Sequence, residues 1–174
     1  MKLFIVVLSL SVCTGVSYGQ KLKNLDDSIQ SEIRKKIPKL KAYIESNEMD
    51  PGLKNVESAF AIDTFKIEYY QRRKVNLHST IGAGVSVTKY VTAQYRILLN
   101  KYYLLAMKIA KPDQKKDISA AQEAWEDFQK KEAVSLFKIY LKNDIANSNY
   151  LYAYGPLIKT RAIALFNCYA ELKG

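Results

Sequence analysis

Residues 87–109 carry the most regular pattern in the chain, and that pattern constrains the fold more than any other feature. Apolar side chains recur there at intervals of three or four residues, the spacing of one face of an α-helix: Val87, Val91, Tyr95, Leu98, Tyr102, Leu105 and Ile109. A second apolar row lies beside the first and consists of Leu99, Tyr103 and Met107. Because the apolar arc is so wide, we expect a central helix over residues 85–110 with neighbours on two sides.

Four further helices are predicted from the same period and from the polar residues, glycines and prolines between the periodic segments. They cover about residues 25–46, 53–74, 118–141 and 150–172. Pro38 predicts a kink or a split in the first of them, and Gly155-Pro156 predicts a delayed start of the last.

The helix over residues 118–141 repeats the apolar pattern with Ile118, Ala121, Trp125, Phe128, Leu136 and Ile139. Leu98, Tyr102, Ala121 and Trp125 are therefore expected to meet in the core, with Asn100 on another side of its helix. No segment shows the sustained alternation of a strand. The predicted fold is all-α, an antiparallel helical bundle of about four to five helices.

The N-terminus has the features of a secretory signal peptide. Lys2 precedes the apolar run Leu3–Val12, and the small residues Ser17 and Gly19 follow at the positions that a signal peptidase favours. The run is well short of the roughly 20 residues that a membrane-spanning helix needs. We therefore expect a signal peptide over residues 1–19, and a single helical domain of residues 20–174 in the periplasm or outside the cell. A lipid anchor would use Cys13, but the residue before it is valine, where a small residue is usual.

Charge and cysteine content limit the kinds of partner. The formal charge is +10, and it falls to +9 when Lys2 is lost with the leader. This excess favours acidic partners such as anionic envelope polymers or lipid headgroups, and the run Arg34–Lys41 is its most basic segment. The export signal argues against nucleic acid, and a solvated lysine-rich surface would produce the same composition. Only Cys168 remains in the mature chain, so no intramolecular disulfide can form.

No motif for catalysis, metal binding or a cofactor is present in the sequence. The only histidine is His78, so a Ser–His–Asp triad would depend on that one residue. HExxH, CxxC and glycine-rich phosphate-loop patterns are all absent. We therefore expect a protein without enzymatic activity that binds no metal and no cofactor.

Arg161 interrupts the apolar face of the last helix, which carries Leu151, Tyr154, Ile158, Leu165, Cys168 and Leu172. An unpaired buried charge is very costly, so the guanidinium should either extend to water or pair with a carboxylate. Asp63 and Glu68 of the second predicted helix are candidate partners. A structural ion pair and a binding site for an anionic ligand both explain an arginine at this position.

Two segments resemble the LprI-like lysozyme-inhibitor family of secreted proteins. Residues 92–103, TAQYRILLNKYY, and residues 118–128, ISAAQEAWEDF, are similar to its LNxxY helix and to its AQxxW helix with a following aromatic residue. The resemblance covers about residues 60–172, and residues 61–68 look like the extended version found in Bacteroides-type bacteria. Its motif residues, which we expect to be helix-packing residues, are Leu98, Asn100, Tyr102, Gln122, Trp125, Phe128, Arg161 and Leu165.

The resemblance implies a binding protein that inhibits a lysozyme-type muramidase by blocking it. The arginine, aspartate and cysteine that usually follow the family's tryptophan are here Gln129, Lys130 and Ala133, so the family's disulfide framework does not carry over. Common lysozymes are basic, so a protein of charge +9 would be repelled unless an acidic patch forms locally.

Such a patch is predicted from Asp113, Asp117, Glu123, Glu126 and Asp127. The alternative function is that of a structural envelope protein, whose basic surface binds anionic cell-wall polymers or lipid headgroups.

Overall fold

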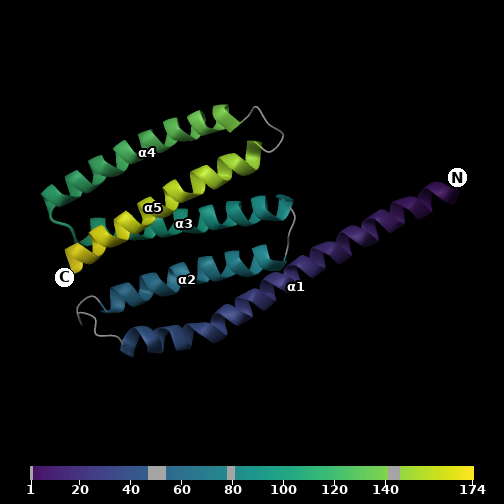
Figure 1. Ribbon diagram of the computed structural model, residues 1–174, viewed down its shortest axis with the longest axis horizontal. Helices are drawn as coiled ribbons and strands as arrows, with labels where there is room; N and C mark the ends of the chain where they lie inside the picture. The colour runs from purple at the N-terminus through teal and green to yellow at the C-terminus, as the bar shows by residue number, and fades with distance from the viewer. Residues whose placement is uncertain (1, 47–53, 78–80, 141–145) are drawn as a thin grey trace. The chain divides into compact units, whose positions relative to one another are not determined.

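Five α-helices make up the described part of the chain. The structure is a computed structural model that describes residues 2–46, 54–77, 81–140 and 146–174, with side chains described for 23–46, 54–77, 84–140 and 153–174. The helices are α1 (Lys2–Ser46), α2 (Lys54–Leu77), α3 (Ile81–Ile109), α4 (Pro112–Tyr140) and α5 (Ala146–Lys173) (Figure 1). No strand occurs in these ranges. The predicted all-α fold is therefore confirmed.

The first helix is much longer than expected. α1 continues through Pro38 and includes both the predicted leader and the first predicted helix, so the split considered at Pro38 does not occur. The chain divides into two units, Met1–Leu40 and Lys41–Gly174, and the second contains the end of α1 together with α2–α5. The predicted domain of residues 20–174 thus spans the second unit and part of the first.

Within the described residues, no helix combines the length and the apolar character needed to cross a membrane.

The helices α3 and α5 form the centre of the second unit. They make the most extensive contact between helices, while α2 packs mainly on α3 and α4 packs on α5. Figure 1 shows α2 to α5 running in alternating directions, so α3 and α5 point the same way. The helix α4 runs back from the end of α3 to the start of α5 and packs on the outside of α5. The central place of α3, with α2 and α5 as its neighbours, agrees with its wide apolar arc.

A group of aromatic side chains joins α2, α3 and α5. Tyr102 of α3 is 1% exposed, and its ring meets Phe60 of α2 and Phe166 of α5 edge-on, with ring centroids 5.4 and 5.3 Å apart. Phe60 and Phe166 stack on each other at 3.9 Å. Edge-to-face and stacked aromatic pairs stabilise a core beyond their buried area. The motif residues Leu98 and Leu165 belong to the same buried cluster.

The helix α4 packs through a different face from the predicted one. Its buried residues are Gln122 and Gln129, and Trp125 packs against the core cluster. Ala121 is exposed, and Phe128 and Ile139 are 50% and 61% exposed, so the packing roles predicted for these three are wrong. The cause is the surface of α5 that α4 contacts. This surface carries the polar groups of Tyr154 and Arg161, which form hydrogen bonds with the amides of Gln129 and Gln122. Glutamine side chains of α4 therefore face α5 in place of apolar ones.

Two helix starts also differ from the predictions. α4 begins at Pro112, about six residues earlier than expected, because Pro112 is in the favoured first position and the backbone N–H of Lys111 donates to Gln114 Oε1 at 2.9 Å. α5 begins at Ala146 and includes Gly155 and Pro156. The predicted delay at Gly155-Pro156 is therefore wrong.

Candidate functional site

Arg161 has a different partner from the predicted carboxylates. Its Nε donates to Gln122 Oε1 of α4 at 3.0 Å, and its guanidinium carbon lies 5.8 Å from the centroid of the Trp125 ring. Burial lowers the pKa of Arg161, and the electrostatic effect of Cys168 partly opposes that change. The predicted ion pair with Asp63 or Glu68 is wrong. Three motif residues, Gln122, Trp125 and Arg161, instead form one contact between α4 and α5.

A second polar contact lies further along the same pair of helices. Tyr154 Oη of α5 accepts from Arg96 Nη2 of α3 and from Gln129 Nε2 of α4, each at 2.5 Å. Arg96 also reaches Gln129 Oε1 at 3.5 Å. Together with the Arg161 contact, these hydrogen bonds hold α4 to the centre of the unit, so this group of polar residues has a structural role.

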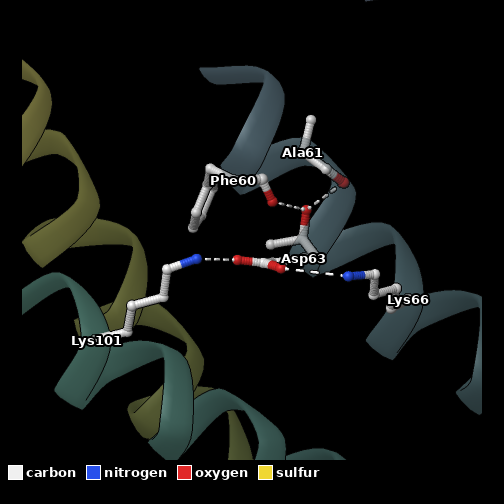
Figure 2. A network of polar contacts seen from close by, with 6 residues as sticks. Phe60, Ala61, Asp63, Lys66 and Lys101 are labelled. Carbon is white, nitrogen blue, oxygen red and sulfur yellow. Dashed lines mark hydrogen bonds and ion pairs between the residues drawn. The ribbon is translucent and has the colours of Figure 1, made fainter. Parts of the chain in front are cut away.

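Asp63 joins α2 to α3 at the surface. Its Oδ2 lies 2.5 Å from Lys101 Nζ, and its Oδ1 lies 3.7 Å from Lys66 Nζ. Figure 2 shows the carboxylate of Asp63 between the two ammonium groups. Exposed ion pairs of this kind contribute only about 0–1 kcal/mol, so Asp63 is a modest link between two helices.

Glu68 is the centre of a polar group contributed by three helices. Its Oε1 accepts from Tyr95 Oη of α3 at 2.9 Å and from Lys159 Nζ of α5 at 2.7 Å. Burial raises the pKa of Glu68, but the hydrogen bonds from Lys159 and Tyr95 and the charges of Lys159 and Arg72 outweigh it, so the pKa is lowered overall. Burial, with Glu68 beside it, raises the pKa of Tyr95.

Sequence reasoning did not find the partners of Glu68. Tyr95 is 27 residues away and Lys159 is 91 residues away along the chain. No spacing rule connects residues at such separations, and the only local signal was Arg72, four residues after Glu68.

The predicted acidic residues are all exposed on one helix, α4. They are Asp113, Asp117, Glu123, Glu126 and Asp127. Asp127 forms an ion pair with Lys131 at 2.7 Å, and Glu126 accepts from Gln122 at 3.1 Å. Five lysines, at positions 115, 116, 130, 131 and 138, lie on the same helix. All five carboxylates are therefore accessible, but neighbouring lysines weaken their field.

The first unit carries a contrasting charge pattern. Arg34, Lys35, Lys36 and Lys39 of α1 are all exposed, and no carboxylate occurs between residues 34 and 41. We refer to these four residues as the basic segment. The basic segment thus contains only positive charges, whereas acidic and basic residues are mixed along α4.

The remaining sequence predictions concern metals, His78, Asn100 and the cysteines. Within the described residues, no group of three or more histidine, cysteine, aspartate or glutamate side chains is placed to hold a metal ion. Asn100 is exposed, on the opposite side of α3 from the core. Cys168 is half-buried and free. His78 lies outside the described residues, as does the side chain of Cys13.

Comparisons of the chain with protein-family models, with curated proteins and with solved structures found no match. The resemblance to the LprI-like family therefore rests on the motif residues alone, and the fold class is that of a helical bundle.

Proposed function

We propose that this protein is an exported, non-enzymatic binding protein that docks on an anionic envelope surface, a polymer or a layer of lipid headgroups, through the basic segment of α1. The observation that carries the proposal is the exposure of Arg34, Lys35, Lys36 and Lys39 with no carboxylate among them. The signal-like N-terminus supports export, and the formal charge of +10 supports attraction to anionic surfaces at a distance.

Vesicle binding with and without anionic lipid tests this function. Each lysine or arginine near an anionic surface contributes about 1 kcal/mol. The double variant K35Q/K36Q should therefore lose about 2 kcal/mol, roughly a 30-fold decrease in affinity. Binding should fall steeply as salt is raised, because the attraction is screened within a Debye length.

The matched control is K115Q/K116Q, which removes the same charge from α4. If both double variants lose affinity equally, total charge rather than the basic segment drives binding. If the protein binds neutral and anionic vesicles equally well, docking by charge is refuted. Purified cell-wall polymer can replace the vesicles in the same design, and it distinguishes a polymer from a headgroup surface.

A second candidate function is inhibition of a lysozyme-type muramidase through α4. The observation that favours it is that Asp113, Asp117, Glu123, Glu126 and Asp127 are all accessible on one helix of a basic protein. A cationic lysozyme would bind there by charge complementarity, although the lysines of α4 and the charge of the whole chain oppose its approach.

Titration of lysozyme activity with the purified protein tests this candidate. D113N/D117N should weaken inhibition, whereas E45Q/E171Q removes two exposed carboxylates elsewhere and should leave it unchanged. An absence of inhibition at protein concentrations well above that of the enzyme would eliminate this function and leave the anionic surface as the target.

A further inference from the structure

Two adjoining depressions open beside the Glu68–Lys159 ion pair, between α2, α3 and α5. The first has a volume of about 380 Å³ and includes Glu68, Arg72 and Lys159 in its lining. The second, of about 300 Å³, lies between α3 and α5. Gln71 and Lys159 line both depressions and so lie at the boundary between them. We call the first depression the charged lobe and the other the second lobe. Volumes of this size are at the lower end of those that hold small ligands.

The charged lobe favours an anion. Its ionisable side chains are two cations, Arg72 and Lys159, and one carboxylate, Glu68. Oε1 of that carboxylate already accepts hydrogen bonds from Lys159 and Tyr95, so its negative charge is largely compensated. Arg72 is exposed, and its positive charge acts on Glu68 within the same lobe. A planar guanidinium next to an ammonium group is well suited to a carboxylate.

The second lobe combines hydroxyl groups with apolar side chains. Thr88, Thr92 and Thr160 line it together with Val91 and Ile163. The Thr88 hydroxyl donates to the Gly84 carbonyl at 2.9 Å. The Thr92 hydroxyl, in contrast, is buried and has no hydrogen-bond partner in the described part of the chain. The Thr92 oxygen is enclosed by the protein, so the surface that this part offers to a ligand is mainly apolar. We call this part the threonine lobe.

We propose that the two lobes together bind a small organic carboxylate. Its carboxylate group lies between Arg72 and Lys159, and its short apolar chain enters the threonine lobe next to Thr92. This binding site is separate from both the basic segment of α1 and the acidic residues of α4, so it does not depend on either function proposed above.

Hexanoate is a suitable probe, because it carries one carboxylate and a chain that fits the threonine lobe. In amide-resolved NMR titrations, hexanoate should shift signals from residues 68–76, 88–95 and 155–163. Acetate lacks the chain, and 1-hexanol lacks the charge, so each should bind at least about tenfold more weakly. Hexylammonium carries the opposite charge and should not shift these signals. Equal responses to hexanoate and hexylammonium would refute the carboxylate site, and so would shifts confined to the basic segment.

Two variants test the lobes separately. R72Q should weaken hexanoate binding about tenfold or more, because a charge-assisted hydrogen bond is lost. K108Q removes one exposed charge of α3 that lies outside the lining and should bind hexanoate normally. If R72Q and K108Q have the same effect, general charge rather than the charged lobe attracts the ligand.

The threonine lobe can be narrowed without any change of charge. An added Cβ at Gly155 would lie 3.0 Å from Thr92 Oγ1, so G155A should displace that side chain and reduce the space for the apolar chain. Alanine is also favoured over glycine within a helix, and a thermal melt checks that the fold is retained. The expected result is weaker hexanoate binding with acetate binding unchanged. Unchanged hexanoate binding in a folded G155A protein would place the chain outside this lobe and overturn the proposal.

Discussion

Two tyrosines of α3, Tyr95 and Tyr102, allow a controlled test of how buried hydroxyl groups affect stability. They lie seven residues apart on the same helix and are 2% and 1% exposed. The Tyr95 hydroxyl donates to Glu68 Oε1 at 2.9 Å, whereas the Tyr102 hydroxyl is buried without a partner among the described residues. The same substitution, tyrosine to phenylalanine, should therefore have opposite effects at the two positions.

The expected magnitudes follow from these contacts. Y102F removes a hydroxyl whose unsatisfied burial costs about 1–3 kcal/mol, and it keeps the ring contacts with Phe60 and Phe166. We expect the free energy of unfolding to rise by about 1 kcal/mol, equivalent to roughly 2–4 °C in Tm. Y95F removes a hydrogen bond to a carboxylate, so we expect a loss of about 1.5–3 kcal/mol.

Chemical denaturation followed by circular dichroism measures both values, and the fluorescence of Trp125, the only tryptophan, provides a second probe. The two variants should differ by about 3 kcal/mol in the free energy of unfolding. If Y102F destabilises the protein as much as Y95F does, the Tyr102 hydroxyl has a partner in solution, and the reasoning about unsatisfied burial fails.

Three further predictions concern the polar contacts. E68Q should lower the free energy of unfolding at neutral pH. The difference from the wild type should shrink as the pH falls through the pKa of Glu68, which is lowered from its ordinary value of about 4.3. A difference in the free energy of unfolding that persists in acid would contradict this prediction. D63N should lower the free energy of unfolding by less than about 1 kcal/mol, and less again at high salt, because Lys101 is 42% exposed. R161M should cost about 1–2 kcal/mol, and a double-mutant cycle with Q122A should give a coupling of about 0.5–1.5 kcal/mol. A coupling near zero would mean that the two side chains do not interact in solution.

The sequence predicted the central helix well. The apolar arc from Val87 to Leu105 identified α3 to within four residues at its start and one at its end, and the buried positions of Leu98, Leu99 and Tyr102 follow the 3.6-residue period. This succeeded because α3 has neighbours on two sides, so most of its apolar residues are needed in the core. Ile109 is the exception at 39% exposed, since it lies at the helix end.

The same reasoning failed on α4. Its apolar residues Phe128 and Ile139 face solvent, while Gln122 and Gln129 are buried. A hydrophobic period identifies the inward face only if the neighbouring surface is apolar, and here the neighbour presents Arg161 and Tyr154. Those groups lie on α5, so nothing within the sequence of α4 reveals them.

The sequence by itself determined the all-α character, the apolar face of α3 and the absence of recognisable catalytic motifs, because all of these depend on local spacing along the chain. Only the tertiary structure decided which polar groups meet. It paired Arg161 with an amide instead of Asp63 or Glu68, and it brought Tyr95 and Lys159 to Glu68. Hydrogen bonds and ion pairs depend on distances of about 3 Å between atoms, and those distances are set by how helices far apart in the chain pack against one another.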